Sequence, residues 1–411
     1  MPRGDIVVGL DVGTTKVASI VAEITPEKEV NIIGVGSNPA VGLRKGVVVD
    51  LGDTVRSIER AVEKAERMAG VDIEGVYVGV AGEHISSLNN RGVVAVSGSR
   101  GEVTEEDVER VLEAVKIISL PADREIIHVI PRGYIIDGQD GIKNPVGMSG
   151  QRLEVEAHIV TGAVTFIQNL LKCVQRVGLM VNDLVLQPVA SASAILYPDE
   201  KEIGVVLVDI GGGTTDIAIF VGGSIAYTVV IPVGGNHFDR DIAYGLSTTL
   251  SEAERIKKEY GYALRSLIPN DELIEVRNIG DEKTRELPQR LVGEIVEARM
   301  QEIFDLVKRE IAKSGYQDLI PAGMVVTGGT ALLKGIVEAA KGSLDLPVRV
   351  GVPQRVGGLT EEVSSPIYAT GVGLVLYGKQ NYERLQPIKA KGGRLLGEVM
   401  GRIKRWFKEF I

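Results

Sequence analysis

The segment IVVGLDVGTTKVASIVAEI, residues 6–24, consists of two apolar runs separated by a short polar centre. The first run ends at Asp11, a Gly-Thr-Thr turn follows, and a second apolar run returns. Glycine, aspartate and threonine are common in turns, and short apolar runs bounded by turn residues are typical of strands. The segment therefore predicts a β-hairpin with a polar tip.

The same design recurs as GVVLVDIGGGTTDIAIFVGG, residues 204–223. Here Asp209 ends the first apolar run, three glycines form the turn, and a Thr-Thr pair begins the return. A pattern repeated at a long separation predicts two related lobes in this α/β chain.

The residue types at both tips indicate a phosphate site. Glycine lets backbone N–H groups approach phosphate oxygens, and threonine hydroxyls add donors. An aspartate at each strand end is suited to hydrated Mg²⁺, which needs only one or two carboxylates, and we assign this role to Asp11 and Asp209. Ordinary hairpin tips also contain Gly and Asp, but two copies ending in Thr-Thr favour function. Besides Asp11, the predicted phosphate-binding residues are Gly13, Thr14, Thr15, Gly211, Gly212, Gly213, Thr214 and Thr215.

Two further segments fit the nucleoside part of such a ligand. In MVVTGGTALLKGIVEAA, residues 324–340, Gly328 and Gly329 follow a short strand pattern and precede a helical one. Such a junction lets a flat ligand lie against the backbone. In AERIKKEYG, residues 253–261, one helical neighbourhood carries Glu254, Lys257 and Lys258, which could reach a ribose and an adenine. On spacing alone, the second segment equally fits an exposed, charged helix face.

In this order and spacing, the four segments resemble the superfamily of actin, hexokinase and Hsp70 ATPases. The resemblance implies a two-lobed, ribonuclease H-like α/β fold with ATP and Mg²⁺ between the lobes. The lobes would hinge on two small-residue helices, within 183–196 and 365–378. It further implies that Gln187 orients the attacking water, that Asp209 acts with it at the catalytic centre, and that Lys16 contacts the phosphates. The expected activity is slow ATP hydrolysis, and the expected main role is nucleotide-dependent assembly.

A separate fold pattern interrupts the first lobe at residues 84–162. Residues 91–98, 125–137 and 152–162 have strand patterns, and a helical pattern covers 105–118. Thr104 and Asp107 resemble a capping box at the start of that helix. A compact α+β domain at this place resembles the FtsA family of bacterial cell-division proteins and its pilus-assembly relative, PilM.

The C-terminal segment RLLGEVMGRIKRWFKEFI, residues 394–411, has a helical apolar arc and a basic opposite face. A cationic amphipathic helix with aromatic bulk suits an anionic membrane surface, although such a helix commonly docks on its own protein core. A polar linker at 379–393 and the excess of Arg and Lys favour the membrane. The predicted membrane-facing residues are Leu395, Leu396, Val399, Met400, Ile403, Trp406, Phe407, Phe410 and Ile411.

Composition excludes several other classes. A net charge of −9 argues against a general nucleic-acid-binding surface, and the scattered four histidines do not have the spacing of a metal site. The sole cysteine, Cys173, lies in an apolar helical pattern and is expected in the core. The chain enters a strand at once, without a signal-peptide pattern, and has no apolar run long enough to span a membrane.

Taken together, the segments resemble the FtsA family over essentially the whole chain. This implies filaments that tether the tubulin-like FtsZ ring to the inner face of the cytoplasmic membrane at the division site and recruit later division proteins. The acidic FtsZ tail peptide would bind the subdomain at about 235–324, where Arg290 and Arg299 are available. PilM remains the alternative, although a membrane-binding tail is not expected there. The expected domains are 1–83 and 163–195 with part of 360–378 (first lobe), 84–162 (inserted domain), 196–359 (second lobe), 379–393 (linker) and 394–411 (membrane helix).

Overall fold

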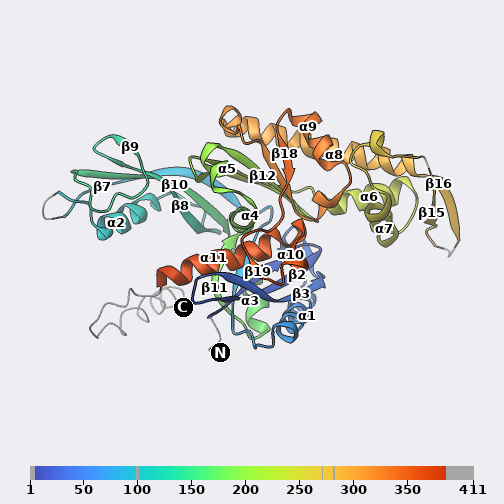
Figure 1. The fold of residues 1–411 in the computed structure, drawn as a ribbon, viewed down its shortest axis with the longest axis horizontal. Coiled ribbons are helices and arrows are strands. Elements are labelled where there is room, and N and C mark those ends of the chain that lie inside the picture. The colour runs from blue at the N-terminus through green and yellow to red at the C-terminus, as the bar shows by residue number, and fades with distance from the viewer. Residues whose placement is uncertain (1–4, 99–100, 271, 281–282, 386–411) are drawn as a thin grey trace.

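The computed structural model describes residues 5–98, 101–270, 272–280 and 283–385 and contains two lobes and an inserted domain (Figure 1). The first lobe is built on a mixed sheet of strand order β11-β6-β1-β2-β3-β19. Within it, β1 and β2 pair antiparallel from Asp5↔Ile24 to Val12↔Val17, which confirms the predicted hairpin, hereafter the first hairpin. The strands are β1 (Asp5–Val12), β2 (Lys16–Ile24), β3 (Val30–Pro39), β6 (Gly75–Val80), β11 (Met180–Leu186) and β19 (Gly357–Gly358).

Helices α1 (Leu51–Ala69) and α3 (Val164–Arg176) pack their apolar faces on the first-lobe sheet. Asp50 caps α1 by accepting a hydrogen bond from the backbone of Asp53, and Gly70 ends the helix in the left-handed region. Cys173 of α3 is fully buried in this core, as expected, and desolvation raises the pKa of its thiol to about 11. A small hairpin, β4 (Leu43–Arg44) and β5 (Val47–Val48), precedes α1.

The second lobe repeats the arrangement with strand order β14-β13-β12-β17-β18. β12 and β13 pair antiparallel up to Ile210↔Thr215 and form the second hairpin. A core of buried side chains joins this sheet to the helices on one of its faces. The strands are β12 (Val205–Ile210), β13 (Thr215–Val221), β14 (Ser224–Ile231), β17 (Met324–Thr327) and β18 (Val348–Val350). The helices are α6 (Gly235–Gly245), α7 (Leu250–Tyr260), α8 (Gln289–Ser314) and α9 (Ile336–Leu344).

Two helices lie between the lobes, α4 (Gln187–Ile195) and α11 (Ala369–Leu385). Their side chains form one core with residues of both sheets, such as Ile20 of the first lobe and Phe220 of the second. A Cβ on Gly373 would lie 1.9 Å from the carbonyl oxygen of Ala190, so only glycine permits this crossing. The two small-residue helices expected between the lobes are therefore present, and they pack closely.

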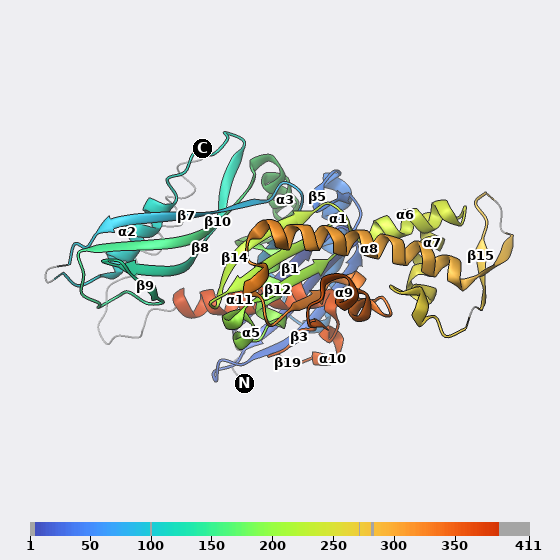
Figure 2. The same ribbon diagram turned by 90° about the horizontal axis from the view of Figure 1, so that it is seen from above.

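The inserted domain is a sheet of order β7-β10-β8-β9 with α2 packed on it. Its elements are β7 (Ser86–Ala95), α2 (Glu105–Val115), β8 (Arg124–Ile136), β9 (Gln139–Ile142) and β10 (Arg152–Ala163). Thr104 and Asp107 form the predicted capping box. Figure 2 shows this domain at one end of the molecule and the hairpin of β15 (Leu273–Arg277) and β16 (Thr284–Pro288) at the other.

Although inserted in the first lobe, this domain also contacts the second. The buried imidazole of His158 lies 2.7 Å from Asn89 Oδ1 and 2.9 Å from the hydroxyl of Thr228 in β14. Lys143 adds an ion pair with Glu202 in α5 (Pro198–Ile203). The domain therefore bridges both lobes.

Two boundaries differ from those expected. β19 pairs with β3, so the chain has re-entered the first lobe before residue 359, followed by α10 (Thr360–Val363). α11 continues to Leu385, so the linker expected from Lys379 is helical in its first part, because no helix breaker precedes Pro387. The rest of the linker and the membrane helix at 394–411 lie outside the described residues. Within 5–385 and its gaps, no described helix is long and apolar enough to cross a membrane.

Candidate functional site

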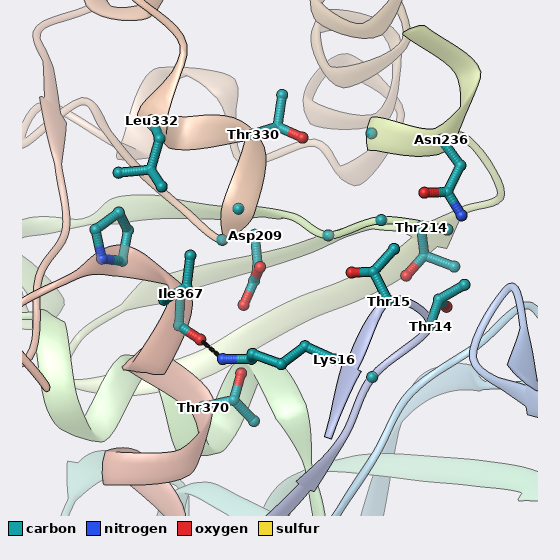
Figure 3. Close-up of a pocket in the computed structure, with 18 of the residues that line it drawn as sticks. Thr14, Thr15, Lys16, Asp209, Thr214, Asn236, Thr330, Leu332, Ile367 and Thr370 are labelled. Carbon is teal, nitrogen blue, oxygen red and sulfur yellow. Dashed lines mark hydrogen bonds between the residues drawn. The ribbon is translucent and has the colours of Figure 1, made fainter. Parts of the chain in front are cut away.

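A cavity of about 480 Å³ lies between the lobes, where the tips of both hairpins meet (Figure 3). It collects the predicted site residues from segments far apart in the sequence, including Gln187 at the start of α4. The predicted residues on its walls are Asp11, Gly13, Thr14, Thr15, Lys16, Gln187, Asp209, Gly211, Gly212, Gly213, Thr214, Glu254, Lys257, Lys258, Gly328 and Gly329. The sequence motifs therefore converge on one place.

The two hairpin tips are in contact, and glycine makes this possible. A Cβ on Gly212 would lie 2.3 Å from Cγ2 of Thr15, and one on Gly213 would lie 2.6 Å from the hydroxyl of Thr14. Any larger residue would push the lobes apart at this point. The backbones of both tips can thus approach one small ligand together.

Thr215 is the exception among the predicted residues. It is fully buried outside the cavity walls, and its hydroxyl donates to the carbonyl of Val233 at 2.8 Å. Successive side chains of a strand point to opposite faces, so Thr214 faces the cavity and Thr215, the first residue of β13, faces away. The expectation that Thr215 contacts a phosphate is therefore corrected.

Three aspartates line the cavity, and the carboxyl group of each has a raised pKa. Desolvation raises the pKa of Asp11, and desolvation together with the charge of Asp11 raises that of Asp209 to about 6. Asp216 reaches a pKa of about 7, first through desolvation and then through the charge of Asp209. Asp11 accepts a hydrogen bond from Gln187 Nε2 at 3.2 Å, and Asp209 accepts one from Ser191 at 3.1 Å. Ionisation of these carboxyl groups is therefore unfavourable unless a cation binds next to them.

Asp216 was not among the predicted site residues, although it directly follows the second Thr-Thr pair. Its Oδ2 accepts from the hydroxyl of Thr214 at 2.9 Å, while its buried Oδ1 has no partner. An unpartnered, buried carboxylate oxygen beside Asp209 fits a hydrated divalent cation. Among the residues that the structure describes, no group of three or more His, Cys, Asp or Glu side chains could hold a metal ion. The aspartates of the cavity therefore fit an ion that keeps most of its water ligands, as Mg²⁺ does.

Lys16 is the cation that the first hairpin brings to these carboxyl groups. Its ammonium donates to the carbonyl of Ile367 and lies 4.2 Å from the ring centroid of Tyr368. Desolvation lowers the pKa of Lys16, while the charges of Asp11 and Asp209 act in the opposite direction. The tip of the first hairpin is thereby tied to the turn before α11.

Another part of the cavity wall is formed by α7 and the segment after β17. Gly328 has φ +85°, and a Cβ there would lie 2.4 Å from Oδ1 of Asp209, so glycine is required. Lys257 is mostly buried, pairs with Asp239 at 2.7 Å and donates to the carbonyl of Gly235. Glu254 and Lys258 pair with each other at 2.6 Å on the more exposed part of the helix.

Several residues of the walls were not among the predicted site residues. Asn236 follows the second hairpin at the start of α6, Thr330 and Leu332 follow the Gly-Gly pair, and Gly46 comes from the β4–β5 hairpin. Asn236 is bound by its backbone to the carbonyl of Gly212 at 2.8 Å, so the turn before α6 closes on the second tip.

The predicted partner residues lie on α8, away from this cavity. Arg299 is not available as expected, because its guanidinium makes two hydrogen bonds with Asp241, at 2.6 and 2.9 Å, and a further bond with Glu302. Arg290 is exposed near the start of the same helix.

Comparison with known proteins identifies the family of the chain. The family model of the cell division protein FtsA matches residues 206–373, and that of the SHS2 domain inserted in FtsA matches residues 82–161. The cell division protein FtsA of Pseudomonas aeruginosa is 47% identical over 408 residues, which cover 98% of this chain and 97% of the relative.

Among solved structures, the PilM-PilN type IV pilus biogenesis complex aligns with a TM-score of 0.67 over 92% of this chain and 99% of the other, at 17% identity. MreB5 of Spiroplasma citri bound to ADP aligns with a TM-score of 0.54 over 93% and 99%, at 18% identity. These likenesses carry the actin-like fold alone, and PilM is only a structural neighbour. The sequence relatives and the inserted domain decide the family: this chain belongs to the FtsA family of actin-like cell-division proteins.

Proposed function

We propose that the chain binds ATP with Mg²⁺ in the cavity between the two hairpins. The observation that carries this proposal is the meeting of the two hairpin tips around Asp11, Asp209 and Lys16. The Thr14 and Thr214 hydroxyls and the tip backbones would hold the phosphates, and Gly328 and Gly329 would face the adenosine. MreB5, which shares the fold, has been solved with ADP.

Asp11 and Asp209 would hold the hydrated Mg²⁺, with Asp216 close by. When bound, the ion would neutralise charge on the phosphates and on these carboxyl groups. Gln187 donates its amide N–H to Asp11, which leaves its amide oxygen to accept from a water molecule. This arrangement supports slow ATP hydrolysis, with Gln187 as the residue that orients the water.

Nucleotide binding would control assembly of the chain into filaments. In this proposal the filaments tether the tubulin-like FtsZ ring to the membrane at the division site and recruit later division proteins. The acidic FtsZ tail peptide would bind the subdomain at about 235–324. Arg290 is exposed near the start of α8, and Arg299 would have to leave Asp241 to contact the peptide.

Attachment to the membrane is assigned to the sequence from Arg394 onward. Its aromatic and aliphatic arc, which includes Trp406, would lie in the inner face of the cytoplasmic membrane, and its basic face would meet anionic lipids. Each basic residue near such a surface contributes about 1 kcal/mol, so one tail binds reversibly and a filament binds more tightly.

Co-sedimentation with anionic lipid vesicles, with and without Mg-ATP, tests this proposal. The full chain should sediment with vesicles, and more so with Mg-ATP. A chain ending before Arg394 should keep its thermal stability and its ATP affinity but lose the vesicles, and Trp406→Glu should approach the same result. Vesicle binding by the shortened chain, or its unfolding, would contradict the anchor.

A further inference from the structure

The β4–β5 hairpin of the first lobe reaches the place where the two tips meet. Arg44 pairs with Val47, so its loop consists of Lys45 and Gly46 alone. Both have positive φ, +50° and +76°, as in the type I′ turn that Asn-Gly favours. Lysine at the first position is conformationally costly, and such strained residues cluster at functional sites.

This turn is wedged among the elements that form the phosphate end of the cavity. The backbone N–H of Gly46 donates to the hydroxyl of Thr14 at 3.0 Å, and Gly46 itself lies on the cavity wall. A Cβ on Gly213 would lie 2.9 Å from Cα of Lys45. The backbone of Lys45 is therefore next to the tips of both hairpins.

The side chain of Lys45 is held by a weak contact. Its ammonium lies 3.3 Å from Oε2 of Glu83, and the two side chains are 34% and 51% exposed. Exposed ion pairs of this kind contribute little to stability and exchange readily. Lys45 can thus leave Glu83 at small cost.

The charges around the cavity call for another cation once a triphosphate is present. Of the lysines on the cavity walls, Lys16 is the one close to Asp11 and Asp209. Lys257 pairs with Asp239, Lys258 pairs with Glu254, and Lys334 lies over the ring of Tyr262. A bound triphosphate would add several negative charges at this end, more than a diphosphate would.

We propose that Lys45 turns from Glu83 to the terminal phosphate of bound ATP, so that the β4–β5 hairpin distinguishes the triphosphate from the diphosphate. This rests on the proposed binding of ATP in the cavity. The Gly46 N–H fixes the hydroxyl of Thr14 as an acceptor, which leaves its proton free for the phosphate, while Lys45 supplies the charge.

The test compares Lys45→Asn with the unaltered full chain by calorimetric titration with Mg-ATP and with Mg-ADP. Asparagine removes the ammonium and suits the turn, so the variant should melt no lower than the unaltered chain. Its affinity for Mg-ATP should fall about tenfold or more, as expected for a lost charge-assisted contact, while its affinity for Mg-ADP should change less than about twofold.

Lys116→Asn is the matched control, because Lys116 also pairs with an exposed glutamate, Glu113, but lies in the inserted domain. It should change neither affinity. Glu83→Gln should keep or increase the affinity for Mg-ATP. Equal losses for both nucleotides in Lys45→Asn, or no loss at all, would overturn the role of Lys45 while leaving ATP binding intact. Failure of the unaltered chain to bind Mg-ATP would overturn the proposed function as well.

Discussion

The two hairpins repeat one backbone design but end in opposite charges. The first runs from Asp11 through Gly13 and two threonines to Lys16, and the second runs from Asp209 through three glycines and two threonines to Asp216. Lys16 has a lowered pKa and Asp216 a raised one, in both cases chiefly because of desolvation. The repeated unit thus presents a cation from one lobe and an extra carboxyl group from the other.

This difference suggests a division of labour between the lobes. The first hairpin adds Lys16, which is suited to compensate phosphate charge directly, whereas the second adds only carboxyl groups and would act through the metal ion that Asp209 shares with Asp11. Neither half is complete alone, and a nucleotide with its ion would join them. The following substitutions test the asymmetry, starting with the largest expected effect on nucleotide affinity.

Asp209→Asn should reduce the affinity for Mg-ATP about 100-fold, or about 2.7 kcal/mol, because the second hairpin loses a charged partner of the metal ion. The affinity for ATP measured in excess chelator should change little. Calorimetric titrations with and without Mg²⁺ measure both values. Unchanged affinity in the presence of Mg²⁺ would show that the second hairpin does not hold the ion.

Lys16→Met should weaken binding of ATP about tenfold with or without Mg²⁺, because the first hairpin acts on the phosphates themselves. The contrast with Asp209→Asn is the point of the experiment. If the loss caused by Lys16→Met also disappeared in chelator, the two hairpins would share one role.

Asp216→Asn should stabilise the chain without nucleotide, and the gain should depend on pH. The carboxyl pKa is about 7 in the fold against 3.8 in the unfolded chain, so the folded state binds more protons between these values. Stability conferred at low pH is therefore lost as pH rises through about 7. The variant should gain on the order of 2–4 kcal/mol at pH 8 and little at pH 4.

Thermal melting of both chains at the two pH values measures this difference. If the variant gained the same stability at pH 4 and at pH 8, then ionisation of Asp216 would not destabilise the folded state. The same variant should bind Mg-ATP less tightly than the unaltered chain, since a carboxyl group placed for a cation is stabilised by it.

Gln187→Ala should spare binding of Mg-ATP and slow hydrolysis, because the residue contacts Asp11 and a water molecule but holds no phosphate. Release of phosphate under saturating Mg-ATP measures the rate. Parallel losses of affinity and rate would make Gln187 a binding residue.

The smallest effects separate the two Thr-Thr pairs. Thr215→Val should cost about 1 kcal/mol of stability, since the hydroxyl bound to Val233 is lost, and leave the affinity for ATP unchanged. Thr15→Val should lower the affinity for ATP and leave the stability unchanged, because Thr15 faces the cavity. Melting temperatures measure the effect of each variant on stability, and titrations with ATP measure its effect on affinity.

The parts that could be predicted from the sequence are those with local patterns. Both hairpins, the two small-residue helices and the Thr104 capping box follow from turn residues, apolar runs and capping preferences within short segments. The repeated Asp and Thr-Thr positions also located the cavity, because strand ends on related lobes come together when the lobes pack.

What could not be predicted depends on contacts made only in the folded chain. Gly46 and Asn236 reach the cavity from segments without a motif. Arg299 is occupied by Asp241, which belongs to a different helix. Asp216 was not predicted as a site residue, because in the sequence it stands within the strand pattern that follows the second Thr-Thr pair. That its Oδ1 atom has no hydrogen-bond partner becomes apparent only in the folded structure.

The central claim is that one nucleotide with its metal ion joins the two hairpins, and titration of the unaltered full chain with ATP tests it most directly. In the presence of Mg²⁺ we expect saturable binding at one site per chain, with a melting temperature that rises with ATP concentration. Excess chelator should weaken that binding at least about tenfold. Absence of binding, or an affinity that is the same with and without Mg²⁺, would contradict the account.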